Sequence, residues 1–155
     1  MGSIRHKIDV QIATRLKGIP TERTFRKWLN AALPKSAELT LRVVNAAEAR
    51  NLNSAFRGKD YATNVLTFVY HEKKSPKLLG DIVLCAPIVA REAHEQGKAL
   101  DAHYAHLTVH GALHLAGMDH EREREALAME KRETTIVKVL GYTNPYARDD
   151  DQHTD

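Results

Sequence analysis

Cysteine is almost absent from this chain of 155 residues, in which Cys85 is the only one. A single cysteine excludes a disulfide framework and a zinc site built from cysteine thiolates. No apolar run approaches the roughly 20 residues that a membrane-spanning helix needs. The opening residues MGSIRHKIDV lack the apolar stretch of a signal peptide. We therefore expect a cytoplasmic protein in a reducing compartment, with no membrane as a partner.

Length and composition point to one globular domain. Hydrophobic residues make up 43% and charged residues 28% of the chain, which is long enough to bury one sizeable core. Charge is uneven: residues 1–80 carry 15 Lys or Arg against 6 Asp or Glu, and residues 81–155 carry 8 against 14. A basic half beside an acidic half indicates an anionic partner, commonly nucleic acid, or serves only solubility.

Hydrophobic periodicity predicts both strands and helices. Strands are expected near residues 8–12, 39–43, 65–70 and 79–85, and helices near 21–33, 45–56, 87–97, 101–116 and 122–140. Asn45 and Glu48 have the spacing of a capping box, and Asp101 is placed to cap a helix. The class is α+β, with one mixed sheet of about four strands covered by about five helices. Residues 1–147 should form a single domain, followed by a disordered acidic tail over residues 148–155.

Histidine is the residue that this chain has in unusual number. Six of its nine histidines lie between positions 94 and 120: His94, His103, His106, His110, His114 and His120. His110 and His114 are four residues apart, so a helix presents both imidazoles on one face, one turn apart. Gly117 can adopt the left-handed conformation that ends a helix, and the chain then turns back. His120 can thereby supply a third metal ligand.

The spacing H-x3-H-x2-G-x2-H is that of metzincin zinc sites. Three neutral imidazoles favour Zn²⁺, with other first-row divalent ions as alternatives, and leave one position open for water. Such a water can attack a carbonyl carbon or a phosphorus atom. The competing interpretation is a helix with surface histidines. Gly111 stands where zincins carry their catalytic glutamate, which counts against a peptidase.

Two neighbours of this motif have alternative roles. Asp119 is expected either to accept a hydrogen bond from a metal-bound imidazole or to cap the following helix. His106 shares the helix face of His110, and we interpret it as a polar residue near the helix start rather than as a further ligand.

Four sequence blocks together resemble the YbeY family of bacterial endoribonucleases. In chain order they are RGKDYATNVLTF (57–68), LLGDIVLC (78–85), HLTVHGALHLAGMDH (106–120) and LGYTNPY (140–146). The resemblance implies a metzincin-like zinc site on a central helix, with His110, His114 and His120 as the metal ligands. It further implies a zinc-dependent, single-strand-specific endoribonuclease that acts in 16S rRNA 3′-end maturation and ribosome quality control. Ribosomal RNA, the small ribosomal subunit and ribosomal proteins are the implied partners.

Other charged residues have expected roles around this chemistry. Arg57 matches the family's arginine for RNA processing, and it is expected in a loop, bound to a phosphate in preference to a surface ion pair. Lys59, Lys73 and Lys74 are expected to line an RNA path with Arg57, giving salt-dependent affinity with little sequence specificity. Asp81 is expected either to hold a metal-site histidine or to pair with a basic residue.

Two other functions stay open at the level of sequence. One is a metallopeptidase, because the ligand spacing is the same; Gly111 and the basic half of the chain count against it. The other is a non-catalytic ribosome assembly factor whose metal is structural, against which the open coordination position counts.

Overall fold

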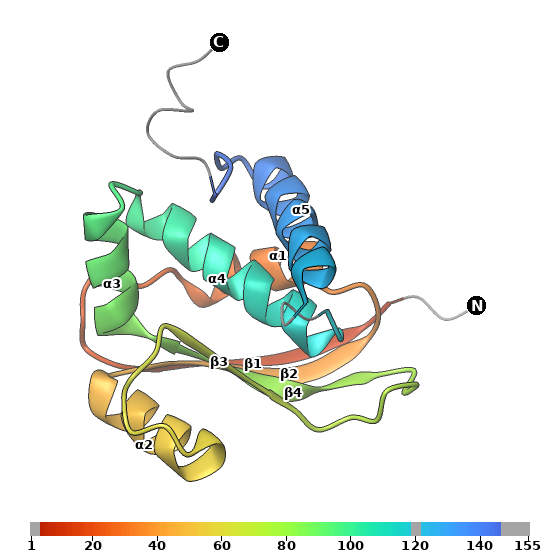
Figure 1. The fold of residues 1–155 in the computed structure, drawn as a ribbon, viewed down its shortest axis with the longest axis horizontal. Coiled ribbons are helices and arrows are strands. Elements are labelled where there is room, and N and C mark those ends of the chain that lie inside the picture. Colours follow the sequence, from red (N-terminus) through yellow and green to blue (C-terminus); the bar gives the residue numbers. More distant parts are fainter. Residues whose placement is uncertain (1–3, 119–121, 147–155) are drawn as a thin grey trace.

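Three strands of the sheet run parallel, and a fourth lies antiparallel at one edge (Figure 1). The computed structural model describes residues 4–118 and 122–146. Within them the elements are β1 (His6–Ala13), α1 (Glu22–Ala32), β2 (Ala37–Val44), α2 (Ala46–Arg57), β3 (Val65–Val69), β4 (Leu78–Cys85), α3 (Ala86–Glu95), α4 (Leu100–Leu115) and α5 (Glu123–Val139). The predicted α+β class, with one mixed four-stranded sheet and five helices, is confirmed. The predicted acidic tail lies outside the described residues.

The strand order β1-β2-β4-β3 places β2 and β4 at the centre of the sheet. Both central strands are buried along most of their length, as expected for strands that helices cover on both faces. β3 pairs with β4 along one side, with Thr67 opposite Ile82, and its other side forms an edge of the sheet. This edge borders a cleft that histidines of α4 also line.

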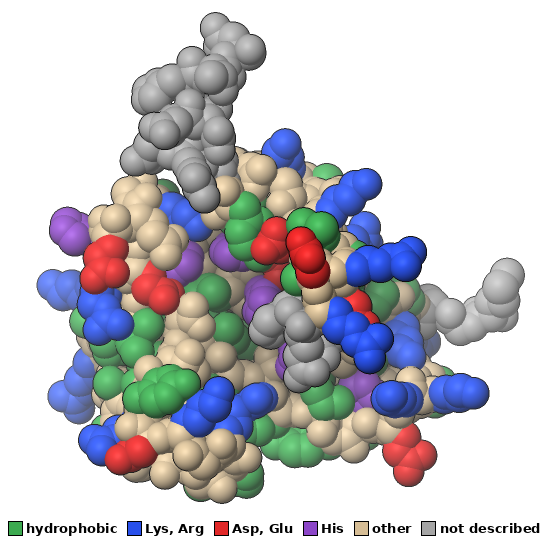
Figure 2. All heavy atoms as spheres, viewed as in Figure 1, with side chains coloured by type: hydrophobic (Ala, Val, Ile, Leu, Met, Phe, Trp, Pro, Cys, Tyr) green, Lys and Arg blue, Asp and Glu red, His purple; other side chains and the backbone are tan. Residues whose placement is uncertain are grey.

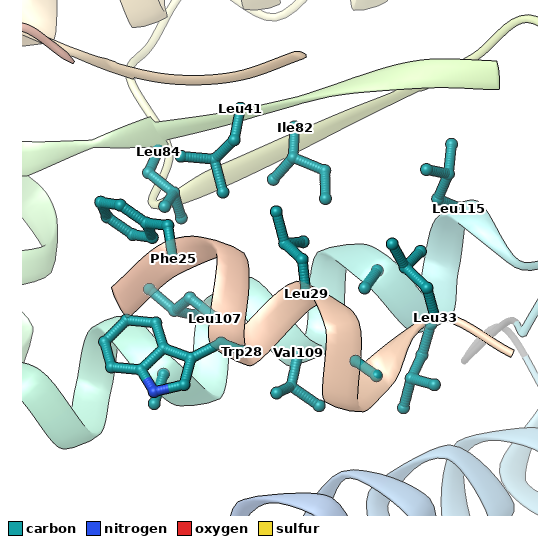
Figure 3. Packing of buried hydrophobic residues seen from close by; sticks show 14 of the residues in the cluster. Phe25, Trp28, Leu29, Leu33, Leu41, Ile82, Leu84, Leu107, Val109 and Leu115 are labelled. Carbon is teal, nitrogen blue, oxygen red and sulfur yellow. The ribbon is translucent and has the colours of Figure 1, made fainter. Parts of the chain in front are cut away.

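Helices cover the two faces of the sheet unequally. α4 crosses one face with α1 and α5 packed against it, and α2 lies on the other face (Figure 1). The apolar stripe of α1 meets β4 in the core, where Phe25 and Leu29 lie against Ile82 and Leu84 (Figure 3). Burial of each such side chain contributes about 1.5–3 kcal/mol. No helix in the described part of the chain is both long and apolar enough to cross a bilayer.

Two glycines allow α4 to lie very close to β4. A Cβ atom at Gly111 would be 3.0 Å from Cγ2 of Ile82, and one at Gly80 would be 2.3 Å from Cδ1 of Leu115. Both distances are shorter than ordinary carbon–carbon contacts of about 3.5–4.0 Å. Packing against the sheet therefore sets the distance between α4 and β4, and with it the position of the histidines on that helix.

Two local predictions at helix ends are wrong. Asn45 does precede α2, but the expected capping box is not formed. The Asn45 side chain instead accepts a hydrogen bond from Thr14 (2.6 Å), and Glu48 accepts two from Arg42 (2.6 and 2.9 Å). An arginine on the neighbouring strand thus outcompetes the local cap. Asp101 lies in the first turn of α4 rather than at its N-cap, where it still favours the positive end of the helix dipole.

Candidate functional site

A cleft of about 240 Å³ lies between α4, the edge strand β3 and the segment around the end of α2. His110 and His114 line it from α4, Thr67 from β3, and Arg57 and Lys59 from the end of α2 and the residues after it. On the face shown in Figure 2, histidine side chains gather near the centre, with lysine and arginine side chains beside them. The fold thus brings two predicted metal ligands and two predicted phosphate-binding residues to one cavity.

The C-terminal half of α4 supplies the imidazoles. His110 and His114 are separated by one helical turn, and both are partly exposed in the cleft. Gly117 follows the helix with φ of +100°, and the amide of Met118 donates to the carbonyl of Leu113 (3.0 Å). This left-handed glycine confirms the predicted turn at Gly117.

The other two residues predicted at this metal centre, His120 and Asp119, lie outside the described residues. Within residues 4–118 and 122–146, no group of three histidine, cysteine or acidic side chains is placed to hold a metal ion. The pair that the structure does describe, His110 and His114, has nitrogen donors suited to Zn²⁺. The three-histidine ligand set stays a prediction.

Glu133 of α5 is a polar centre of the site that the sequence motifs do not predict. Its side chain is fully buried, and it accepts hydrogen bonds from Nδ1 of His110, Nε2 of His106 (3.2 Å) and the hydroxyl of Tyr146. Burial raises the pKa of Glu133, but these hydrogen bonds outweigh it and lower the pKa to about 2. Glu133 is therefore a carboxylate at neutral pH.

A signal for Glu133 was present in the sequence. The residue lies in the apolar stripe of α5, between Met129 and the pair Ile136 and Val137, which are all buried. A glutamate in an apolar stripe is buried, and a buried carboxylate requires hydrogen-bond donors or an opposite charge beside it. The stripe indicates a buried carboxylate, although it does not indicate that histidines of α4 are the partners.

Arg57 is the last residue of α2, so the prediction that it lies in a loop is wrong. Its Nη2 donates to the carbonyl oxygen of Thr67 (2.6 Å), and its guanidinium carbon lies 5.8 Å from the centroid of the Phe68 ring. Asn64 just before β3 and Tyr70 just after it make backbone hydrogen bonds to residues of β4 that continue the register there. Backbone groups of successive residues in a strand point to opposite sides, and Thr67 lies an odd number of residues from both. The carbonyl of Thr67 therefore points away from β4, toward the free edge. Arg57 therefore occupies a hydrogen-bonding position on the open edge of the sheet.

The structure separates the predicted RNA-binding lysines. Lys59 lines the cleft with Arg57, and the segment that carries it is held by buried Asn53, which donates to the carbonyl oxygen of Tyr61 (2.9 Å). Lys73 and Lys74 are exposed in the connection between β3 and β4, and they do not belong to the cleft wall. The antiparallel turn from β3 to β4 carries these two lysines past the end of the sheet.

Asp81 is also placed apart from the histidines. Its neighbours Gly80 and Ile82 approach α4, so the alternation along β4 directs Asp81 to the opposite face of the sheet. Its carboxylate accepts a hydrogen bond from the hydroxyl of Tyr70 (2.7 Å), which raises the pKa of Tyr70 to about 12. The structure thus does not bring Asp81 to the imidazoles of α4.

Comparison with known proteins agrees with this architecture. A family model described as Endoribonuclease YbeY matches residues 8–141. Endoribonuclease YbeY of Aromatoleum aromaticum is 61% identical over 128 residues, which cover 83% of this chain and 82% of that protein. The protein of the same name from Stenotrophomonas maltophilia (strain R551-3) is 53% identical over 155 residues, covering 94% of this chain and 96% of that protein. In the corresponding protein of Azoarcus sp. (strain BH72), at 58% identity over 134 residues, the match spans 83% of this chain but only 53% of that protein.

A solved structure is similar over nearly the whole fold. The solution structure of TM1509 from Thermotoga maritima superposes with a TM-score of 0.61 at 26% identity, covering 90% of this chain and 99% of that one. The cleft between α4 and β3 lies within residues 8–141, the range that the family model matches. The chain belongs to the Endoribonuclease YbeY family.

Proposed function

We propose that this protein is a zinc-dependent endoribonuclease that cleaves single-stranded ribosomal RNA in the cleft between α4 and β3. Membership of the Endoribonuclease YbeY family supports the endoribonuclease activity. The observation that carries the assignment to this cleft is that Arg57 and Lys59 line it beside His110 and His114. Nitrogen ligands for a metal and cations for a phosphate thus face the same space.

His110 and His114 would hold the metal, together with His120 from beyond the described residues. When bound, Zn²⁺ supplies a Lewis acid that stabilises negative charge on phosphoryl oxygens. Nδ1 of His110 donates a hydrogen bond to the buried carboxylate of Glu133. This arrangement of donors fits a divalent metal, because histidines that bind metals usually donate their other ring nitrogen to a carboxylate or a carbonyl.

Arg57 is proposed to bind the scissile phosphate. A guanidinium has five N–H donors, and the carbonyl of Thr67 engages one of its nitrogen atoms. That contact fixes the orientation of the side chain, so little conformational entropy is lost when other donors bind phosphate oxygens. Lys59 adds a second positive charge in the same cleft and strengthens attraction to the RNA backbone.

Two features of the cleft favour RNA over a peptide substrate. Gly111 stands where zinc peptidases carry their general base, and a side chain at that position would come within 3.0 Å of Ile82, so the close packing of α4 on β4 disfavours a glutamate there. Peptides often bind by adding a strand to a sheet edge, which requires free carbonyl groups along that edge. Here Arg57 occupies the carbonyl of Thr67 on the edge strand.

The finer biological assignment rests on the resemblance to the family. We propose that the substrate is the 3′ end of 16S rRNA, processed on the small ribosomal subunit in the cytoplasm during maturation and quality control. Ribosomal proteins would supply specificity that the cleft does not, since arginine and lysine contacts to phosphates carry little sequence information. The excess of basic residues over positions 1–80 supports an RNA partner.

The test compares substrates and variants in one preparation. Wild-type protein with Zn²⁺ should cleave a labelled single-stranded RNA but neither its duplex form nor casein. Arg57→Lys should lower kcat by about 10²–10³-fold, as when one transition-state hydrogen-bond donor is lost, while zinc content stays at the wild-type value. Arg91→Lys, at an exposed position of α3 that does not line the cleft, is the matched control and should retain nearly full activity. Casein cleavage that His114→Ala abolishes, with RNA left intact, would overturn the proposal.

A further inference from the structure

Glu133 receives hydrogen bonds from three side chains, and they are divided between its two oxygens. Oε1 accepts from Nδ1 of His110, whereas Oε2 accepts from the hydroxyl of Tyr146 and from Nε2 of His106 at 3.2 Å. The carboxylate has no exposed surface, so water does not substitute for these partners. Its interactions are therefore set by the relative positions of α4, α5 and the segment after α5.

The contact with Oε1 determines the tautomer of His110. A carboxylate only accepts hydrogen bonds, so Nδ1 of His110 carries the proton. In a neutral imidazole the other nitrogen, Nε2, then has the lone pair. Because the two nitrogens lie on different sides of the ring, a ring that directs Nδ1 to Glu133 of α5 directs Nε2 away from it, and His110 lines the cleft.

The contacts with Oε2 hold the carboxylate in place. The ring of Tyr146 lies edge-on to that of His106, with centroids 5.1 Å apart. Tyr146 is itself held by its backbone, which donates to Asn144 (2.9 Å), and the preceding Pro145 accepts from Lys98 (2.7 Å). The segment after α5 thus anchors the oxygen that His110 does not use.

We propose that Glu133 is the positioning residue of this site: it holds His110 as the Nδ1–H tautomer, with Nε2 available to a metal ion. His106 and Tyr146 hold the carboxylate of Glu133 in position. This inference deepens the proposed function and rests on it for the identity of the metal. It also gives His106 a role: its Nε2 contacts Glu133, and its buried Nδ1 has no hydrogen-bond partner within the described residues. His106 supports the carboxylate and is not a ligand.

The principal test measures zinc affinity by competition with a chromophoric chelator. Glu133→Gln should weaken Zn²⁺ binding by about 10–100-fold, the usual effect of removing a partner of a metal-bound histidine. The glutamine amide has an acceptor oxygen on one side and an NH2 donor on the other, so it no longer accepts from both the His110 and the Tyr146 donors as the two carboxylate oxygens do. The matched control is Glu92→Gln, which alters the carboxylate that pairs with His103 of the same helix and should leave the zinc Kd within twofold of wild type.

A second measurement needs only the wild-type protein: without metal, the ¹⁵N shifts of His110 should identify the Nδ1–H tautomer. Where Glu133→Gln folds, the Nε2–H form should gain population in that variant. An Nε2–H tautomer in wild type would overturn the inference, as would a zinc Kd in Glu133→Gln within twofold of wild type or an equal loss in Glu92→Gln. Wild-type protein that binds no Zn²⁺ would instead overturn the proposed function, and the His110 tautomer would still decide the inference.

Discussion

Two carboxylates, Glu92 and Glu133, pair with histidines of α4 in the described part of the chain, and burial is reversed between the Glu92–His103 pair and the Glu133–His110 pair. In the first pair, the His103 imidazole is 4% exposed and Glu92 is 26% exposed. In the second, the His110 imidazole is 25% exposed and Glu133 is fully buried. The same type of hydrogen bond therefore has a different role in each pair. The first pair secures the imidazole inside the fold, whereas the second secures the carboxylate and leaves the imidazole facing a cleft.

The surroundings of the two pairs agree with this division. Glu92 also accepts a hydrogen bond from Asn64 (3.0 Å), so the first pair ties α3 and α4 to the residue before β3. Burial lowers the pKa of His103 despite the neighbouring Glu92, so the imidazole is neutral at pH 7. In the second pair, His110 lines the same cleft as Arg57. The identity of the paired residues thus does not determine their role, and the exposure of the imidazole does.

The largest expected difference between the pairs is in metal binding and activity. His110→Ala removes a proposed ligand and should abolish stoichiometric zinc binding and lower RNA cleavage by at least about 10²–10³-fold. His103→Ala should retain zinc and most of the activity, since its imidazole contacts Glu92. Elemental analysis and cleavage assays on both variants check this. Equal zinc content in wild type and His110→Ala would contradict the ligand assignment, and zinc loss in His103→Ala would break the comparison.

A smaller difference is expected in the stability of the metal-free protein. Glu133→Ala leaves the donors of His106, His110 and Tyr146 without their acceptor and should lower the free energy of unfolding by about 3–5 kcal/mol, on the order of 1–2 kcal/mol for each donor. Glu92→Ala should lower it by only about 1–2 kcal/mol, because water reaches this partly exposed position. Urea unfolding in a chelator measures both values. Equal losses would show that burial of the carboxylate does not distinguish the pairs.

The sequence predicts those features that depend on local spacing. The periodicity of apolar residues is sufficient for the α+β class, and the four-residue interval between His110 and His114 is sufficient to place both on one helix face. Gly117 adopts the expected left-handed conformation because the requirement for it is local to the chain. These features need no knowledge of which element packs against which.

The sequence does not predict contacts that depend on packing between elements. His110 and Glu133 are 23 residues apart, and His106 and Tyr146 are 40 apart, so no motif spacing joins them. The same holds for the lysines of the β3–β4 connection. They follow the cleft residues of β3 within a few positions of the sequence, but they do not line the cleft.

The smallest expected effect concerns a link between the first pair and the cleft. Asn64 donates to Glu92 and accepts from the amide of Val65 (2.7 Å), and it ends the segment that carries Lys59 and Tyr61 along the cleft. Asn64→Ala removes both hydrogen bonds, worth about 1 kcal/mol each, so the segment should be less well ordered. We expect KM for single-stranded RNA to rise about threefold, with kcat and the zinc Kd unchanged.

Steady-state kinetics would measure this change. The control is Asn51→Ala, at an exposed position of α2. A changed zinc Kd would mean that the two pairs are coupled through the fold, whereas an unchanged KM would confine the first pair to stability alone.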